Sequence, residues 1–339
     1  MRVACHFTIP RPPHLELDAA VQDGLKIVAE VGGEVNFLYP GKKANVLYPR
    51  FFSGFQQLPQ LIQLDRRVDV HHVFSNGFYP YPIFSFLKKP ILLSTVISLQ
   101  QNEPIKFPRI LQRIKRFIVP THRDQQIMRD WGYENVSVVM PGIELSSFSF
   151  SSCKISQPKF VLLMGSAPWN KSQFDTKGID LLLHVMQELQ WVAMVFLWRG
   201  LFLEDMIKRV EAAGVQDRVT LITDHVDVDN VLAGVHAAII LAENMQIVKA
   251  YPHSLLEAMA TGKPVIVSEC LQVSDFVRNN NCGEVVSKLD SDCLKTAIQN
   301  LKENYSKYCH SIQRAPIEGF SSSRMLNELK MLYNSVVEL

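Results

Sequence analysis

The chain has 339 residues, of which 47% are apolar and 20% are charged, a balance typical of globular proteins. This length predicts about two domains, with hydrophobic cores large enough to be stable without disulfide bonds. The formal net charge is +2, with +5 in residues 1–150 (17 Lys and Arg against 12 Asp and Glu) and −3 in the remainder (18 against 21). So weak a basic bias does not indicate a nucleic-acid-binding protein.

The cysteines and the apolar runs indicate whether the protein binds a metal and in which cellular compartment it is found. Six cysteines are scattered along the chain, and none forms a C-x-x-C pair. This spacing argues against a zinc or thioredoxin-like site and favours free thiols in a reducing compartment. No run of about 18 apolar residues is present, and the first ten residues form only a short apolar strand without the features of a signal peptide. We expect a soluble, cytoplasmic protein without a metal.

Short apolar runs alternate with amphipathic segments in the first half of the chain. The pattern predicts strands at residues 2–9, 34–39, 68–74, 90–97, 117–119 and 136–140, and helices at residues 17–31 and about 123–131. Gly32-Gly33 ends the first of these helices. Such alternation is typical of a parallel sheet covered by helices on both faces.

A serine-rich stretch at residues 146–152 indicates a linker, after which the alternation resumes. Strands are expected at residues 160–164, 191–198, 219–223, 236–241 and 265–268, and helices at residues 178–189, 203–213, 229–234, 254–261 and 292–303. We therefore predict an α/β protein with two Rossmann-like parallel-sheet domains, residues 1–147 and residues 148–321. The C-terminal helix, about residues 322–339, is expected to pack back on the first domain.

Residues 251–266 combine a loop, a helix and a buried strand. In an open parallel sheet, ligands bind at the carboxyl ends of the strands, in loops such as this one. The N–H groups and partial positive charge at the start of the helix suit a diphosphate. A second interpretation is a capping box, in which Ser254 and Glu257 satisfy the first N–H groups of the helix. Spacing alone leaves both interpretations open.

The same segment resembles the donor site of the large group of retaining GT-B glycosyltransferases (glycosyl transferases group 1, family 4-like). The resemblance rests on the helix Leu256-Glu257-Ala258-Met259-Ala260 followed by Gly262-Lys263-Pro264-Val265. Residues 140–144, Gly165 with residues 177–182, and residues 282–286 agree with it in order and spacing. It implies the GT-B fold, two Rossmann-like domains facing a cleft. It also implies transfer of a sugar from a UDP- or GDP-type donor to an acceptor hydroxyl, with retention.

The resemblance also assigns roles to residues of this chain. Glu257 would accept hydrogen bonds from the ribose hydroxyls, and the N–H groups of Ser254 and Leu255 would bind the diphosphate. Lys177 would stabilise the diphosphate as it leaves, because negative charge grows there; the alternative is a solvated lysine on the first turn of a helix. The nucleotide sugar is a substrate, and no tightly bound cofactor or metal is implied. The donor-binding residues expected are Gly165, Ser166, Lys171, Arg199, Tyr251, His253, Ser254 and Leu255.

Two departures from the family pattern change the charge of the expected site. Eight positions before Glu257, where the family has a second glutamate, this chain has Lys249, whose ammonium group only donates hydrogen bonds. Glu243 is the candidate to replace that carboxylate. After the strand glycine, where the family has an arginine, this chain has Ser166, and Lys171 or Lys249 would supply the charge. The departures favour a non-catalytic relative as one alternative. A nucleotide-sugar epimerase is a second alternative, because a fold does not fix a function.

Four histidines and one arginine remain as weaker candidates for a functional role. His6 and His14, at and after the end of the first strand, are either an acceptor-side base or residues without a role. His71 and His72 are neighbours on a strand, so they point to opposite faces and do not easily share a metal. Arg199 follows a strand and either contacts the donor base or lies on the surface.

The segment from Lys106 to Phe117 is basic and amphipathic. Arg109, Arg113 and Arg116 fall on one face of a helix drawn through it, and Ile110, Ile114 and Phe117 on another. Such a helix rests either on anionic lipid, at the inner face of a membrane, or on its own domain.

Taken together, the sequence and the resemblance predict three partners. These are a nucleotide-sugar donor, an acceptor that is a glycan, a lipid-linked molecule or a small molecule, and a membrane surface. Nucleic acid is not expected.

Overall fold

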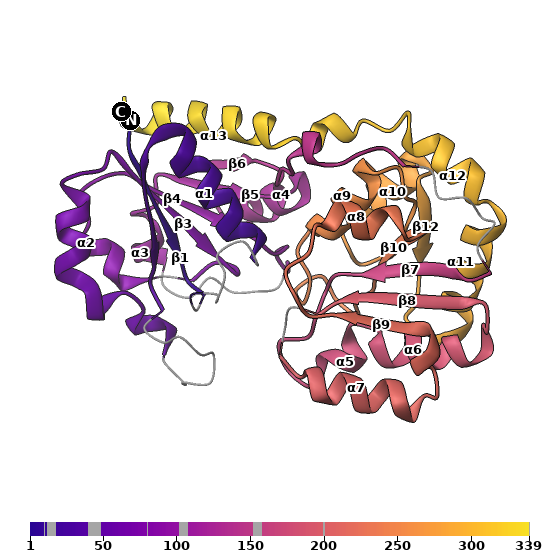
Figure 1. Cartoon of the computed structure of the whole chain (residues 1–339). Coiled ribbons are helices and arrows are strands. Elements are labelled where there is room, and N and C mark those ends of the chain that lie inside the picture. Colours follow the sequence, from indigo (N-terminus) through magenta and orange to yellow (C-terminus); the bar gives the residue numbers. More distant parts are fainter. Residues whose placement is uncertain are drawn as a thin grey trace. The chain divides into compact units, whose positions relative to one another are not determined.

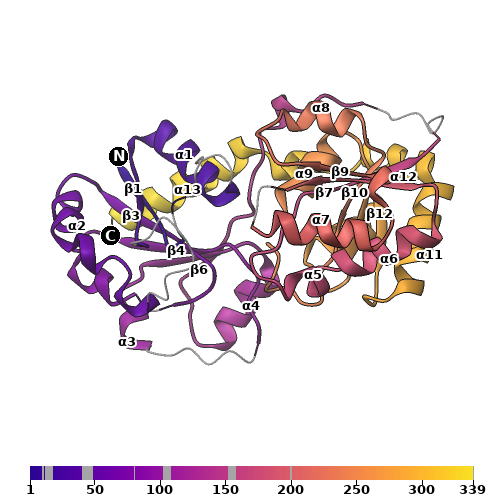
Figure 2. The ribbon, with the colours of Figure 1, turned by 60° about the horizontal axis from the view of Figure 1, so that its bottom comes forward.

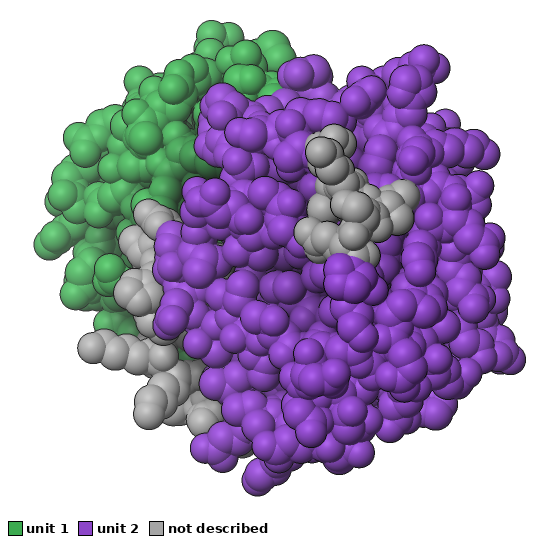
Figure 3. All heavy atoms as spheres, turned by 45° about the vertical axis from the view of Figure 1, so that its right-hand side comes forward, with its two compact units in different colours: residues 1–142, 320–339 green, residues 143–319 purple. Residues whose placement is uncertain are grey.

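The computed structural model describes residues 1–9, 11, 18–39, 49–79, 81–101, 108–151, 158–198 and 201–338. The chain forms two compact units, coloured separately in Figure 3. The first consists of Met1–Gly142 together with Phe320–Leu339, and the second of Ile143–Gly319. Each unit contains a six-stranded parallel sheet with helices, so the predicted α/β class is confirmed.

The sheet of the first unit has the strand order β2-β1-β3-β4-β5-β6, with every pair parallel. The strands are β1 (Val3–Phe7), β2 (Gly33–Phe37), β3 (Val70–Ser75), β4 (Ile91–Thr95), β5 (Arg116–Val119) and β6 (Val136–Val138). The helices are α1 (Ala19–Val31), η2 (Arg50–Phe52), η3 (Phe55–Gln57), α2 (Leu58–Asp65), η4 (Pro82–Phe86), α3 (Pro108–Leu111), α4 (His122–Asp130) and α13 (Ser322–Val337).

The ends of these helices follow from their capping residues. The Asp18 carboxylate accepts hydrogen bonds from the N–H groups of Ala20 (2.8 Å) and Val21 (3.3 Å), so α1 begins there. The hydroxyl of Thr121 accepts from the N–H of Asp124 at 3.0 Å and begins α4 in the same way. Gly32 ends α1, as its sequence position predicts.

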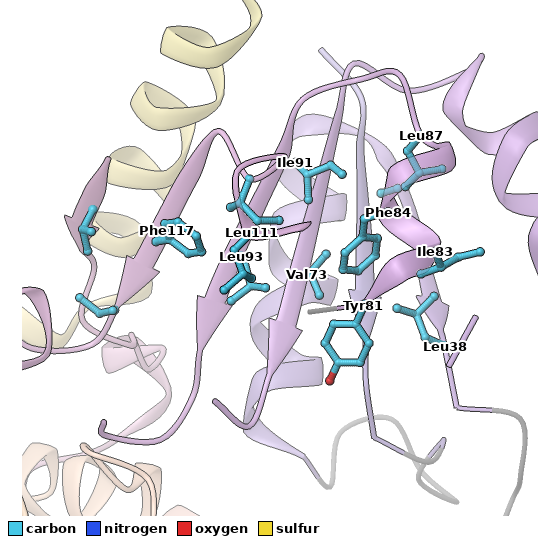
Figure 4. Close-up of a cluster of buried hydrophobic side chains, with 14 of the residues drawn as sticks. Leu38, Val73, Tyr81, Ile83, Phe84, Leu87, Ile91, Leu93, Leu111 and Phe117 are labelled. Atoms are coloured by element: carbon cyan, nitrogen blue, oxygen red, sulfur yellow. The ribbon is translucent and has the colours of Figure 1, made fainter. Parts of the chain in front are cut away.

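Each face of this sheet is covered by its own apolar cluster. One face packs against α1 and α13, which lie side by side (Figures 1 and 2). The other face packs against η4 and the segments around it, as Figure 4 shows for Val73, Tyr81, Phe84 and Leu93. A sheet buried on both faces explains why its strands read as continuous apolar runs in the sequence.

Helix α13 packs within the first unit although it follows the second in sequence. Its buried residues Met325, Leu329, Tyr333 and Val336 recur at helical spacing on one face. Arg324 donates a hydrogen bond to the carbonyl of Met140 at 3.0 Å. These contacts attach the C-terminal segment to the sheet of the first unit.

The sheet of the second unit has the order β12-β11-β10-β7-β8-β9, again with every pair parallel. The strands are β7 (Phe160–Met164), β8 (Val192–Leu197), β9 (Val219–Ile222), β10 (Ala237–Ile240), β11 (Val265–Ser268) and β12 (Gly283–Val286). The helices are η5 (Leu145–Ser147), α5 (Gln173–Thr176), α6 (Ile179–Glu188), α7 (Leu203–Ala212), η6 (Gln216–Arg218), α8 (Val228–Ala233), α9 (His253–Ala260), α10 (Val273–Asn280), α11 (Ser291–Glu303), α12 (Tyr305–Ile312) and η7 (Ile317–Phe320).

The helix predicted through the segment from Lys106 to Phe117 is wrong. Residues 102–107 lie outside the described part of the chain, α3 ends at Leu111, and Phe117 belongs to strand β5. Ile114 and Phe117 are core residues, 3% and 1% exposed. Because the chain must enter a buried strand here, its apolar residues are used by the sheet rather than by one continuous helix face. No helix in the described residues is long and apolar enough to cross a membrane.

Candidate functional site

The second sheet reverses its strand order next to β7. From β7 the chain proceeds through β8 to β9 on one side, whereas β10, β11 and β12 lie on the other. The loops after β7 and β10 therefore leave neighbouring strand ends toward different sides. Such a switch point is where open parallel sheets bind ligands.

Lys177 lies in the segment that follows β7, between α5 and α6. The residue is 2% exposed, and its Nζ donates hydrogen bonds to Ser166 Oγ (3.0 Å) and to the carbonyl of Ala167 (3.0 Å). Burial lowers the pKa of this amine from 10.5 to about 8, because the charged form loses solvation. The alternative of a solvated lysine on a first helical turn is wrong.

Gly178 lets the chain turn directly after Lys177. Its φ of +63° lies in the left-handed region, and an added Cβ would lie 2.9 Å from Leu241 Cδ1. Leu241 directly follows β10, so the close approach joins the segment after β7 to the loop after β10. The N–H of Glu243 adds a second link by donating to the Thr176 carbonyl at 2.8 Å. The position of Lys177 is thus fixed from both loops.

The start of α9 lies beside the end of β7. A Cβ added at Gly165 would lie 2.9 Å from Ser254 Cβ and 3.1 Å from its Oγ, so only glycine permits this approach. Glu257 follows Ser254 by three residues and is half-buried, which places both on one helix face. Ser166, Lys177 and Ser254 therefore gather around the end of β7 and the start of α9, and Glu257 lies about one turn further along that helix.

The capping box predicted for Ser254 and Glu257 is wrong. Helix α9 begins at His253 with Pro252 as its N-cap, so Ser254 is the second helical residue instead of the cap. The N–H groups of Leu255 and Leu256 both donate to the Pro252 carbonyl, at 3.0 and 3.2 Å. The N–H of Leu255 is therefore already engaged, and its side chain is fully buried.

The remaining expected site residues differ in position. Lys171 is 68% exposed at its side chain and pairs with Asp205 of α7 at 2.9 Å, instead of joining Lys177. Glu243 is exposed, while Lys249, Tyr251 and His253 are half-buried on the loop after β10 and the first position of α9. Arg199 lies outside the described residues.

Sequence reasoning missed two parts of this site, Ala167 and Leu241. Ala167 contributes its carbonyl oxygen and Leu241 its apolar side chain. Neither contribution requires an unusual residue type, so no sequence signal marks them. Gly178 did carry a signal, because residues 177–182 belong to the segments that resemble the family.

The histidines of the first unit are structural neighbours in its core. His6 is 0% exposed, and both its ring nitrogens have partners, His71 Nδ1 at 2.8 Å and Asn36 Nδ2 at 3.3 Å. Its interpretation as an acceptor-side base is therefore wrong. His72 bonds to Tyr333 of α13, so the two adjacent histidines do face opposite sides of the sheet. His14 lies outside the described residues, among which no group of His, Cys, Asp and Glu is placed to hold a metal.

Comparisons with known proteins bear on the family of the second unit and on the fold of the whole chain. Residues 157–317, most of the second unit, match the family model "Glycosyl transferases group 1". No curated protein matches the chain in sequence. The structure of HepE from Anabaena in complex with UDP is 14% identical with a TM-score of 0.73, covering 99% of this chain and 100% of that one.

Two further structures share this likeness over nearly the whole chain. A glycosyltransferase from Rickettsia africae has a TM-score of 0.74 at 15% identity and covers 99% of both chains. Sucrose-phosphate synthase from Thermosynechococcus elongatus has a TM-score of 0.70 at 14% identity and covers 98% of both chains. The chain therefore has the GT-B fold, as predicted, and its second unit matches the group 1 glycosyltransferases in sequence.

Proposed function

We propose that this protein is a glycosyltransferase. It would bind a nucleotide-diphosphate sugar at the site around Lys177 and Ser254. The sugar would pass, with retention of configuration, to a hydroxyl of a glycan, lipid-linked or small-molecule acceptor, in glycan or glycolipid biosynthesis. The observation that carries the proposal is Lys177, a buried cation at the switch point of the second sheet. The proposed place of action is the cytoplasm or the inner face of a membrane.

The chemistry requires a positive group where the nucleotide leaves. Transfer breaks the bond between the anomeric carbon and the diphosphate oxygen and forms one from that carbon to the acceptor oxygen. The acceptor proton passes to the leaving phosphate or to solvent. Negative charge grows on the diphosphate as the first bond breaks, and a desolvated ammonium opposes it more strongly than one in water. Lys177 would supply this charge, with the start of α9 adding its partial positive charge.

The nucleotide would extend along α9. Glu257, on the helix face that carries Ser254, would accept hydrogen bonds from the ribose hydroxyls. HepE, which shares the fold, has been solved with UDP and with UDP-glucose. UDP-sugars are therefore the first donors to test, and GDP-sugars the second.

A second candidate function is donor binding without turnover. It is favoured by Lys171, which pairs with Asp205 and so does not replace the arginine absent at Ser166. Lys249 likewise stands where the family has a carboxylate. A nucleotide-sugar epimerase would differ from both in consuming donor without an acceptor.

Thermal unfolding in the presence of UDP-, GDP- and ADP-sugars tests donor binding. We expect one class to raise the Tm of the wild type and of Lys208→Ala, which removes an exposed lysine of α7. Glu257→Gln and Lys177→Met should lose that rise, because they remove the ribose acceptor and the diphosphate partner. A normal rise in both variants, or no rise with any donor in the wild type, would contradict the proposed site.

Release of the nucleotide then separates the candidates. A transferase should release it slowly with water and faster with an acceptor. A binding protein should bind donor and release none. Conversion of the donor into another nucleotide sugar, with no acceptor present and no nucleotide released, would indicate the epimerase.

A further inference from the structure

An exposed group of aromatic rings lies on the first unit. Phe51, Phe52, Phe55 and Phe86, here called the phenylalanine cluster, contact one another in that order, with ring centroids 5.4, 6.4 and 6.0 Å apart. Phe51, Phe52 and Phe86 are 38%, 50% and 51% exposed. Single exposed apolar residues are ordinary, but a contiguous group of them marks a contact surface.

The backbone beneath the phenylalanine cluster is fixed to the core. Gly54, with φ of +90°, turns the chain between η2 and η3, and its N–H donates to the Leu38 carbonyl at 2.9 Å. Leu87, which follows Phe86, is 1% exposed and belongs to the same apolar cluster as Phe84, Ile83 and Leu38 (Figure 4). The rings are therefore held outward by an anchored support.

The chain around the phenylalanine cluster is basic. Residues 49–64, 81–101 and 108–116 contain no aspartate or glutamate. Asp65, which accepts from the N–H groups of Lys88 and Lys89, is only 6% exposed and also bonds to His71. The Arg113 guanidinium donates to the carbonyls of Leu87 and Lys88, which joins α3 and the residues after it to the segment that carries Phe86. The basic side chains of the last two segments are Lys88, Lys89, Arg109, Arg113, Lys115 and Arg116.

We propose that the phenylalanine cluster and its basic rim, which consists of Lys88, Lys89 and Arg113, dock on the surface of an anionic lipid bilayer. Aromatic rings partition into the interfacial layer of a membrane, and lysine and arginine attract anionic headgroups. A second copy of this chain fits less well, because a symmetric contact through the cluster would bring the two basic rims together. The surface differs from the continuous helix expected between Lys106 and Phe117, although Arg113 belongs to both. The proposal is independent of sugar transfer.

Flotation with vesicles tests the proposal without any donor. The full-length protein should float with phosphatidylglycerol-containing vesicles and remain unbound with phosphatidylcholine alone. Phe52→Ser combined with Phe86→Ser should lower the partition coefficient at least tenfold, because two apolar side chains no longer leave water. Lys88→Glu combined with Lys89→Glu should abolish binding to the anionic vesicles while leaving the Tm close to that of the wild type.

Met331→Ser provides the matched control, since Met331 is 65% exposed in the same unit but lies on α13. It should float like the wild type. Absence of wild-type flotation, or equal flotation of the phenylalanine variant, would overturn the proposal. So would self-association of the wild type that the phenylalanine variant loses, because it would assign the cluster to a second copy.

Discussion

The ring nitrogens His6 Nε2 and His71 Nδ1 lie 2.8 Å apart inside the first unit, with the two rings stacked at 5.0 Å. His71 Nε2 is in turn 3.1 Å from Asp65 Oδ1. The carboxylate accepts, so His71 donates from Nε2 and accepts at Nδ1 from His6. His6 Nδ1 then accepts from the Asn36 amide, 3.3 Å away. Burial lowers the pKa of both imidazoles and so favours their neutral forms, and in neutral rings these contacts fix one tautomer for each.

We expect the free energy of unfolding to fall between pH 7 and pH 5. Burial holds the pKa of His6 well below its ordinary value, lowers that of His71, and lowers that of His72 to about 3. In the unfolded chain these groups titrate near 6.5, so below that pH the unfolded state takes up protons that the folded state does not. The free energy of unfolding is therefore not reduced by these histidines above pH 6.5, and it falls as the pH drops below that value. His72 alone should account for about 2 kcal/mol at pH 5, measurable by urea unfolding.

A pair of substitutions isolates the buried histidines. His184→Gln removes a histidine whose side chain is 59% exposed and should leave the pH dependence unchanged. His72→Gln should reduce it. Equal slopes in the two variants would contradict the assignment of the pH dependence to burial.

The efficiency with which the enzyme uses its nucleotide-sugar donor should fall above pH 8. Because burial lowers the pKa of Lys177 to about 8, the free enzyme loses its diphosphate-binding charge as the pH rises through that value. We expect kcat/KM for the donor to fall about tenfold per pH unit above it. The Lys177→Arg variant, which stays charged, should show no such fall whatever its absolute activity. An identical profile in both proteins would argue against Lys177 as the titrating group.

Alanine substitutions at Gly178 and Gly214 distinguish the energetic cost of crowding from the cost of a left-handed backbone conformation. Their φ values are +63° and +64°, but a Cβ would lie 2.9 Å from Leu241 Cδ1 at Gly178 and within 4 Å of nothing at Gly214. Gly214→Ala should cost about 1 kcal/mol, from the left-handed conformation alone. Gly178→Ala should cost about 1–3 kcal/mol more, because Leu241 must move. Equal losses of unfolding free energy in the two variants, measured with denaturant, would show that Leu241 can move aside without cost.

The hydrogen bond between Tyr333 and His72 should stabilise the attachment of α13. The Tyr333 hydroxyl lies 2.6 Å from His72 Nδ1, and both residues are fully buried. Tyr333→Phe should therefore lower the free energy of unfolding by about 1–3 kcal/mol, because a buried ring nitrogen loses its partner. Met331→Ala, on the exposed face of the same helix, should change it by less than about 0.5 kcal/mol. Equal losses in the two variants, measured by thermal unfolding, would contradict a stabilising role for this hydrogen bond.

The strands were predictable because both sheets are buried on two faces, so that β3 and β7 appear as short apolar runs with turns between them. Helices α10 and α12 were not predicted. Each has eight residues, and neither begins with a side-chain N-cap hydrogen bond that would mark its start. The capping box failed for a related reason: its four-residue pattern marks a helix start only to within a residue, and Pro252 begins α9 earlier.

The sequence by itself determined the α/β class, the alternation of strands and helices, and the segments that resemble a donor site, because these depend on local pattern and residue order. The burial of Lys177 and its bonds to Ser166 and Ala167 were decided only by the tertiary structure. The tertiary structure also decided that His6 is buried, with His71, 65 residues away in sequence, as its hydrogen-bond partner. Solvation and hydrogen-bond partners depend on which distant segments the sheets bring together, and no local pattern records that choice.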